Sequence, residues 1–291
     1  MTERQTLRAA SAEERIIVRR PGPAERSPAA AATRRRTLEL GLAIAVPVVL
    51  VGLWQLAASR GWIDARLYPS PSTIVANGWD LAVDGKLWPD VWATSRRVVL
   101  GFLLGTGIGV LLGLVMGTSR TVRAALEPLL DALYVVPKLA LLPIFLNMFG
   151  LGEGPQLALV AATVFFFVWI STMSAFLAVP EGYREAGEVF GAGRWQMFRH
   201  VLLPGALPQI MVGARIAAGV SVLVIVASEF VAATDGLGYL IFNSRALFQN
   251  DVMYVGIVCV AVLGVIFSEI IRFIGRRLTP WAPGDRDRVR T

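Results

Sequence analysis

The side chains that could do covalent chemistry are few in this chain of 291 residues. It has a single histidine, His200, and a single cysteine, Cys259, which lies in an apolar run. One cysteine cannot form an intramolecular disulfide or a multi-cysteine metal site. One histidine far from it is a poor basis for a metal cluster or a Ser–His–Asp site. We therefore expect a chain that is not an enzyme and that holds no metal and no cofactor.

The two lysines of the chain do not indicate a site for ATP hydrolysis. A phosphate-binding loop needs a lysine followed by Ser or Thr after a glycine-rich turn, because the lysine reaches the phosphates. The chain has only two lysines: Lys86 is followed by Leu87, and Lys138 follows Pro137. Neither fits this pattern, so any ATPase that drives the protein must be a separate chain.

Two charged residues lie inside apolar stretches and are candidates for a solute pathway. Charged side chains at membrane depth are costly and usually face a bundle interior or water. Lys138 follows Pro137, where a helix should bend, and its cation could attract a sulfonate, carboxylate or nitrate. Alternatively, Lys138 lies near the inner face and extends to the headgroups. Glu229 could line an outer gate or pair with Lys138, and Asn147 could offer a hydrogen bond in the same pathway.

The chain that positions these residues is unusually apolar. Hydrophobic residues make up 55% of it and charged residues 17%, with a mean hydropathy of +0.60. Soluble domains have about 45–50% apolar and about 25% charged residues, so the bilayer is the natural solvent here. The net charge of +7 then indicates basic flanks on the inner side and contact with anionic headgroups. We do not expect nucleic-acid binding.

Six stretches have the roughly 20 mainly apolar residues that a membrane-spanning helix needs. They are Leu38–Ala58, Val98–Met116, a stretch within Leu126–Phe149 that Pro137 and Pro143 break, Leu157–Val179, Ile210–Ala232 and Val252–Ile274. Glycines recur every four residues in the second stretch: Gly101, Gly105, Gly109 and Gly113. This spacing puts them on one helix face, where another helix can approach closely. The sequence predicts an all-α, polytopic membrane protein with about six transmembrane helices.

The distribution of basic residues predicts the orientation. With the N-terminus inside, the inner segments are 1–37, 117–125, 180–208 and 272–291, which hold most of the arginines. The outer segments are 59–97, 150–156 and 234–251, which are rich in aspartate. Arg96 and Arg97 are exceptions, and we expect them to extend to the outer headgroups. An even number of spans puts both termini in the cytoplasm.

These features divide the chain into four regions. They are a disordered cytosolic tail (1–37), the first span with an external interfacial segment (38–97), a core transmembrane domain (98–281) and a second cytosolic tail (282–291). The interfacial segment carries Pro69, Pro71 and flanking tryptophans, of which Trp79 is one. Aromatic side chains favour the headgroup zone, so part of this segment should lie on the outer surface as an amphipathic helix.

The most informative stretch is a polar interruption, Pro180–Pro204, between two apolar runs. Its apolar residues are spaced for one face of helical segments, with charged residues at the other positions. Gly191 and Gly193 should break it into two pieces, and Pro204 and Pro208 should end it. Such a helix–turn–helix is too polar to insert into a bilayer and too apolar to remain alone. We predict that it binds a protein partner.

This stretch resembles the EAA loop of ABC-transporter permease subunits, and we call it the coupling loop. The family pattern is E-A-A, three residues, G, nine residues and I-x-L-P. The chain matches it with Glu185-Ala186-Gly187, Gly191 and Val201-Leu202-Leu203-Pro204. Gly187 replaces the third-position Ala and Val201 replaces Ile. The resemblance implies that this loop is a cytoplasmic coupling helix docked on an ATP-hydrolysing subunit. The residues in that role would be Glu185, Ala186, Gly187, Gly191, Val201, Leu203 and Pro204.

The resemblance extends over residues 38–281. Pro69-Ser70-Pro71, Met148-Phe149-Gly150-Leu151-Gly152 and Gly236-Leu237-Gly238-Tyr239-Leu240 are similar to signatures of the subfamily that imports nitrate, sulfonate, taurine and related compounds. It implies the type I ABC importer permease fold in the cell membrane. The implied partners are two ATPase subunits, an external solute-binding protein and a second copy of the permease. The implied solute is a small anion, with a non-anionic nutrient such as a vitamin precursor as the alternative.

Two other classes of protein fit the sequence less well. A secondary transporter driven by an ion gradient would have paired broken helices in two repeated halves, whereas the chain has one broken span and no clear repeat. An intramembrane enzyme would need a catalytic set of side chains, which the lone histidine and cysteine do not supply. We therefore expect a permease that works by alternating access and is driven by a separate ATPase.

Overall fold

The computed structural model of the protein describes residues 28–282, and side chains from residue 37 onward. The regular elements of this part are helices: α3 (Pro28–Ser59), α4 (Pro71–Val83), α5 (Leu87–Thr118), α6 (Arg120–Val135), the 3-10 helix η1 (Lys138–Leu141), α7 (Leu142–Phe149), α8 (Gly154–Leu177), α9 (Glu181–Val189), α10 (Arg194–Gln196), the π-helix η2 (Met197–Leu202), α11 (Leu203–Ala232), α12 (Leu237–Ala246) and α13 (Asn250–Leu278). The predicted tails lie outside the described residues at 1–27 and 283–291. Residues 28–37 belong to α3, which begins before the predicted span start at Leu38.

Helix α3 belongs to a unit that ends at Ala57, and the rest of the chain forms a second unit. Residues Thr37–Ser59 of α3 have a mean hydropathy of 2.2 over their most apolar window, none of which is buried within the structure. A helix of 23 residues with this composition is long enough to cross a bilayer of about 30 Å.

The described residues contain five helices that are long and apolar enough to cross a membrane. The count becomes six if the bent pair Arg120–Val135 and Lys138–Phe149 is one span. Its two parts meet at 92°. The break lies next to Pro137, since proline removes a backbone donor and breaks the helix. The predicted all-α fold with about six transmembrane helices is therefore confirmed.

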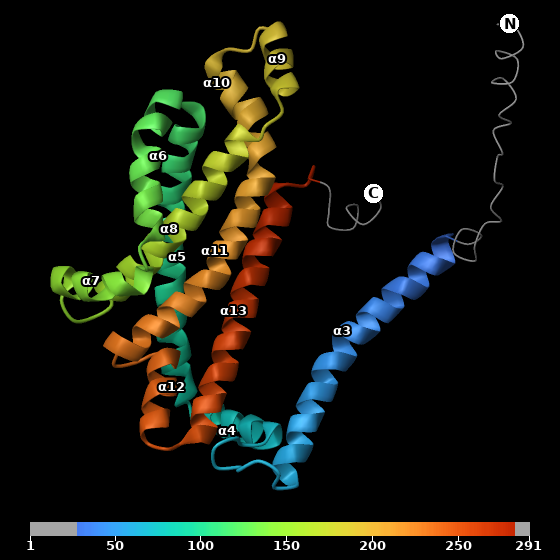
Figure 1. Cartoon of the computed structure of the whole chain (residues 1–291), viewed down its shortest axis with the longest axis vertical. Coiled ribbons are helices and arrows are strands. Elements are labelled where there is room, and N and C mark those ends of the chain that lie inside the picture. The colour runs from blue at the N-terminus through green and yellow to red at the C-terminus, as the bar shows by residue number, and fades with distance from the viewer. Residues whose placement is uncertain (1–27, 283–291) are drawn as a thin grey trace, which may run out of the picture. The chain divides into compact units, whose positions relative to one another are not determined.

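The centre of the second unit is the packing of α5 and α11 against α8 (Figure 1). A Cβ atom added to Gly105 would lie 2.4 Å from the Ala161 carbonyl oxygen, and one added to Gly109 would lie 2.9 Å from that of Phe165. Side chains do not fit at such distances, so glycine is what allows the backbones of α5 and α8 to touch. The predicted close approach at the glycine face is confirmed.

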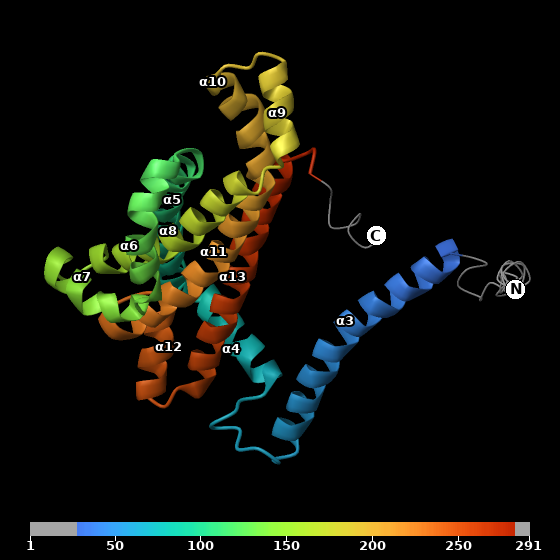
Figure 2. The same ribbon diagram turned by 45° about the horizontal axis from the view of Figure 1, so that its top comes forward.

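The two ends of the second unit differ in their elements. Helices α9 and α10 lie at one end, whereas α4 and α12 lie near the other, as both views show (Figure 2). Helix α4 begins at the Pro-Ser-Pro sequence, where the Ser70 hydroxyl accepts a hydrogen bond from the Thr73 amide and Pro71 occupies the first turn. This is a typical helix start. The long helix α11 joins the two ends, so it connects the coupling loop to the turn before α12.

Candidate functional site

The tip of the coupling loop is closed by a glycine in the left-handed conformation. Helix α9 ends at Val189 and is capped by Phe190, and the next residue, Gly191, has φ = +74°. The Gly191 amide donates to the Glu188 carbonyl, and the Ala192 amide donates to the Gly187 carbonyl, each at 2.9 Å. This pair of bonds is the Schellman motif, which uses glycine because it tolerates positive φ. The glycine of the EAA pattern thus sets the turn between the two pieces of the loop.

Gly187 is small because α9 folds back on the second piece of the loop. A Cβ atom at Gly187 would lie 2.7 Å from the Met197 terminal methyl and 3.7 Å from a methyl of Val201. An alanine, which the family pattern has here, would require only a shift of the flexible Met197 side chain. Glu185 and Ala186 are exposed on the other side of α9.

Pro204 and Pro208 do not end the coupling loop, so this prediction is wrong. The chain continues from α10 through the π-helix η2 into α11, and the resulting helix covers Arg194–Ala232. Pro204 lies in the first turn of α11 and Pro208 lies inside it. Pro208 has no N–H to bond the Pro204 carbonyl, and the Trp281 indole N–H donates to that oxygen at 3.3 Å instead. A remote side chain therefore offsets the helix-breaking effect.

Large apolar side chains are exposed at the tip of the loop. Val189 is 84% exposed and Phe190 89% exposed. Arg184 anchors α9 to the core, because its guanidinium donates to the Phe176 carbonyl at 2.9 Å. A groove of about 600 Å³ lies beside the tip, with Glu188 and Trp195 in its lining. The loop is thus a fixed projection with an apolar end.

Lys138 lies at the break of the bent span. Its ammonium group donates to the carbonyls of Leu133, Tyr134 and Val136 at 2.8–2.9 Å, which uses its three N–H groups. These carbonyls lie at the end of α6 and at its C-cap, Val136, where carbonyls lack the intrahelical partners of a helix interior. Lys138 is half-buried, and Asn147 is exposed on α7.

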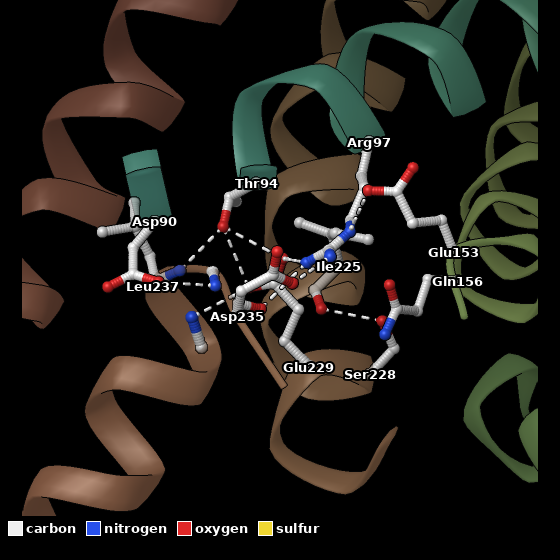
Figure 3. Close-up of polar contacts among 12 residues, drawn as sticks. Asp90, Thr94, Arg97, Glu153, Gln156, Ile225, Ser228, Glu229, Asp235 and Leu237 are labelled. Carbon is white, nitrogen blue, oxygen red and sulfur yellow. Dashed lines mark hydrogen bonds and ion pairs between the residues drawn. The ribbon is translucent and has the colours of Figure 1, made fainter. Parts of the chain in front are cut away.

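Glu229 pairs with Arg97, and not with Lys138 as the sequence had suggested. The Arg97 Nη1 and Glu229 Oε1 atoms are 2.8 Å apart, and the two side chains are 4% and 0% exposed. The Thr94 hydroxyl lies 3.0 Å from both carboxylate oxygens (Figure 3). The expectation that Arg97 extends to the headgroups is wrong, because its partners lie inside the protein.

Arg97 also contacts the segments that flank α11 and α8. Its Nη1 donates to the Asp235 carbonyl at 3.0 Å, and its Nη2 pairs with the Asp235 carboxylate. Its Nε lies 3.4 Å from Glu153 Oε1, and the same carboxylate pairs with Arg96. One guanidinium therefore joins α5 to the residues before α8 and to the turn between α11 and α12. We call Asp90, Thr94, Arg97, Glu153, Glu229 and Asp235 the charge cluster.

The start of α12 is built onto the charge cluster. Three consecutive amides donate to it, each at 2.8 Å: Gly236 to Asp90, Leu237 to Thr94 and Gly238 to Glu229. Amides in the first turn of a helix have no intrahelical partner, so these side chains cap α12.

The glycines at this helix start are required by the same contacts. A Cβ atom on Gly236, which has φ = +108°, would lie 2.5 Å from Glu229 Oε1, and one on Gly238 would lie 2.6 Å from Glu229 Cβ. The association of Arg97 with Glu229 was not predicted from the sequence. The available signal was an arginine just before one apolar stretch and a glutamate inside another, which is followed by a Gly-x-Gly sequence.

Comparison with known protein families identifies the family of this chain. Residues 105–280 match the family described as the inner membrane component of binding-protein-dependent transport systems. The chain belongs to this family. The permease is 37% identical over 238 residues to the aliphatic sulfonates transport permease protein SsuC of Escherichia coli K12, covering 82% of this chain and 90% of the relative. It is a multi-pass membrane protein and a permease of an ABC importer.

Two further relatives of the permease have names that match the predicted subfamily. The taurine transport system permease protein TauC of Escherichia coli K12 is 32% identical over 248 residues, covering 84% of this chain and 90% of the relative. The nitrate import permease protein NrtB of Leptolyngbya laminosa is 30% identical over 258 residues, covering 85% and 90%. The predicted membership of the nitrate, sulfonate and taurine subfamily is confirmed.

Solved structures agree with the predicted fold of the permease. A chain of the inward-facing MetNI methionine ABC transporter matches with a TM-score of 0.56 at 23% identity, covering 69% of this chain and 99% of that chain. A chain of a bacterial ABC transporter that imports alginate matches with a TM-score of 0.58 at 18% identity, covering 88% and 98%. At these identities the likeness shows the fold, which is that of type I ABC importer permeases.

Proposed function

We propose that this permease imports a small anionic solute by alternating access, driven by two separate ATPase subunits that dock on the coupling loop. The solute is a sulfonate, taurine, nitrate or a related organic acid, delivered by an external solute-binding protein. A second copy of the chain completes the membrane domain, and both termini face the cytoplasm. The observation that carries this proposal is the apolar tip of the coupling loop.

The tip has the features of a surface that docks in a groove. Val189 and Phe190 are the most exposed apolar residues of the loop, and they lie beside a turn that Gly191 fixes. Exposed apolar side chains on a short amphipathic helix are typical of binding to a hydrophobic groove. The tip is held to the core by Arg184 and continues into α11, so movement of a docked partner would be transmitted to a span.

The coupling role can be tested by changing the turn and, in a separate variant, the exposed tip. Gly191→Val places a branched side chain at φ = +74°, where an L-residue is disfavoured by about 1–2 kcal/mol. We expect loss of ATPase co-purification and about a tenfold lower ATP turnover stimulated by the binding protein. Gly193→Ala is the matched control, because Gly193 has φ = −67° and a Cβ there would make only an ordinary contact, 3.7 Å from the Gln196 Oε1 atom. Normal docking and turnover in both Gly191→Val and Phe190→Asp would contradict the coupling role.

The anionic solute is supported by the relatives and by Lys138. The three relatives are named for aliphatic sulfonates, taurine and nitrate, which all carry an oxyanion group. Lys138 caps α6 through carbonyls and forms no ion pair with a described residue, so its positive charge is not neutralised by a carboxylate. We assign Lys138 and Asn147, at the broken span, to the solute pathway. Glu229, the third residue predicted for that pathway, we assign to the charge cluster.

The charge of the solute can be tested with two measurements. Calorimetric titration of the binding protein should detect binding of taurine, alkanesulfonates or nitrate; binding of neutral compounds alone would contradict an anionic solute and leave the coupling role intact. Uptake into proteoliposomes should show a KM that rises about tenfold in Lys138→Ala, as for one lost interaction of about 1.4 kcal/mol. Lys138→Arg, which keeps the charge, should retain most of the affinity. An unchanged KM in Lys138→Ala would remove this residue from the pathway.

A further inference from the structure

The polar atoms of the charge cluster have hydrogen-bond partners toward α11 and α12, but one polar atom lacks a partner toward α8. Toward α11 and α12, the Glu229 carboxylate accepts from Arg97, Thr94 and the Gly238 amide. Toward α8, the Arg97 Nε atom is buried and forms no hydrogen bond within the described residues. The nearest acceptor that the structure gives for it is Glu153 Oε1 at 3.4 Å, beyond the usual length of such a bond.

A second buried group, on Gln156 in the first turn of α8, also lacks a hydrogen-bond partner for one of its atoms. The Gln156 side chain is 1% exposed, and its Nε2 donates to the Ala232 carbonyl at 3.0 Å. Its Oε1 atom is buried without a hydrogen-bond partner among the described residues. Buried polar atoms are rarely left unpaired, so one on Arg97 and one on Gln156 at the start of α8 require an explanation (Figure 3).

Exposure separates Glu229 from the other two carboxylates that pair with Arg97. The Glu229 side chain is 0% exposed, whereas Glu153 is 32% exposed and Asp235 54% exposed. Separation of a buried ion pair is strongly disfavoured, because each partner would become an unpaired buried charge. A partly exposed pair exchanges with water at little cost. The Arg97–Glu229 bond is therefore the fixed part of the cluster, and the contact with Glu153 is the part that can change.

We propose that Arg97 is a positioning residue for transport, which holds the α11–α12 turn against α5 while its contact with Glu153 changes during the transport cycle. In the structure this contact is loose. In the alternative state, the segment 150–153 that precedes α8 moves toward Arg97, and Nε donates to the Glu153 carboxylate. Helices α5 and α8 stay packed through their glycine contacts, and only the segment 150–153 before α8 moves relative to Arg97 and the α11–α12 turn.

This proposal rests on the proposed transport function and adds the element that moves. Its geometric basis is independent of the coupling loop, because the cluster and the loop lie at opposite ends of α11. The charge cluster also has four carboxylates and two arginines when Arg96 is included. This excess of negative charge does not suit an anion site, and it supports a mechanical role for the cluster.

The first test measures distances in the permease assembled with its ATPase and binding protein in proteoliposomes. Spin labels are attached to cysteines in a Cys259→Ser background at Trp92, Leu151 and Leu247, which are 68%, 95% and 58% exposed. We expect the distance from Trp92 in α5 to Leu151 before α8 to shift between the nucleotide-free and the vanadate-trapped states. The distance from Trp92 to Leu247, at the end of α12, should stay the same. A shift in the second distance, or none in the first while the labelled permease still transports, would overturn the proposal.

The second test uses variants of the loose contact. Glu153→Gln keeps the size of the side chain and removes its charge, so assembly and basal ATP turnover should stay within about twofold of the wild type. Uptake stimulated by the binding protein should fall by about fivefold or more. Arg97→Lys, which has a charge but not the forked donors, should lower uptake in the same way. Arg96→Gln is the matched control, because Arg96 pairs with the same Glu153 carboxylate but is 47% exposed.

The outcomes of the second test separate this proposal from the proposed function. Wild-type uptake in both Glu153→Gln and Arg97→Lys would overturn the role of Arg97 and leave the permease as an ATP-driven importer. Loss of assembly in Glu153→Gln would also overturn it, because the contact would then be a requirement for folding. If the wild-type assembly hydrolysed ATP without any uptake, the proposed function itself would fail.

Discussion

At the scale of single residues, the buried pair of Arg97 and Glu229 explains several sequence features together. The carboxylate accepts from a guanidinium, a hydroxyl and a backbone amide. Its position leaves no room for a Cβ atom at Gly236 or Gly238. The Gly-Leu-Gly sequence therefore lets the backbone lie against the Glu229 carboxylate and cap it, and it is not only a flexible turn.

The Glu229→Gln variant tests how much this pair contributes to stability. It keeps the shape of the side chain, but its amide group must face donors from Arg97, Thr94 or Gly238, and Arg97 loses a buried counter-charge. Removing one partner of a buried ion pair costs about 3–5 kcal/mol. We expect a lower midpoint temperature for loss of the monodisperse peak in detergent.

The control for this variant is Glu269→Gln. Glu269 pairs with Arg272 one helical turn away at 2.7 Å, with side chains 49% and 32% exposed. Exposed pairs contribute about 0–1 kcal/mol, so the midpoint should hardly change. Equal effects of the two variants would show that burial does not strengthen the role of Glu229.

At the scale of elements, the contact between α5 and α8 depends on glycine at every turn. Gly105→Ala would put a Cβ 2.4 Å from a backbone oxygen of α8, and backbone cannot give way as a flexible side chain can. Overpacking of this kind costs about 1–3 kcal/mol or more. We expect a lower yield of folded permease and a lower midpoint temperature in detergent.

Gly107→Ala provides a control on the same helix. Gly107 has open space where a Cβ would be, and alanine is favoured over glycine inside a helix by about 1 kcal/mol. Its yield and midpoint should equal or exceed those of the wild type. A loss as large as that of Gly105→Ala would mean that alanine destabilises this helix for a reason other than contact with α8.

The start of α11 is stabilised by a second remote contact, which a double-mutant cycle can measure. Trp281→Phe removes the indole donor to the Pro204 carbonyl and keeps an aromatic ring, so it should cost about 0.5–1.5 kcal/mol. In a Pro208→Ala background, the new amide of residue 208 can bond the same carbonyl within the helix. Trp281→Phe should then have almost no effect on the detergent midpoint. Equal losses in both backgrounds would assign the role of Trp281 to packing instead of to this hydrogen bond.

The features that could be predicted from the sequence are those whose causes lie in residues close together along the chain. The spans follow from apolar length, the bend from Pro137, and the close approach of α8 from the spacing of Gly101 to Gly113. The pairing of Arg97 with Glu229 joins positions 132 residues apart, and no periodic pattern carries that information. The continuation of the helix through Pro204 was also not predictable, because its compensating donor is Trp281, far along the chain.

At the scale of the whole molecule, the two ends of the second unit carry different charges. Arginines gather at the end with the coupling loop: Arg120, Arg123, Arg184, Arg194, Arg199, Arg276 and Arg277. The end with α4 and α12 has the carboxylates of the charge cluster. Because basic loops face the cytoplasm, this asymmetry favours a cytoplasmic coupling loop and an external charge cluster.

Cysteine labelling at the two ends of α5 tests this orientation. Lys86, just before α5, has a side chain that is 69% exposed, and Thr121, just after it, is also exposed. A helix of 32 residues is about 48 Å long, so the two positions should lie on opposite sides of a bilayer of about 30 Å. In intact cells and a Cys259→Ser background, a membrane-impermeant maleimide should label Lys86→Cys, and Thr121→Cys only after permeabilisation. Neither position lies in the coupling loop. The reverse pattern would place the coupling loop outside the cell, where an ATP-hydrolysing partner could not drive it.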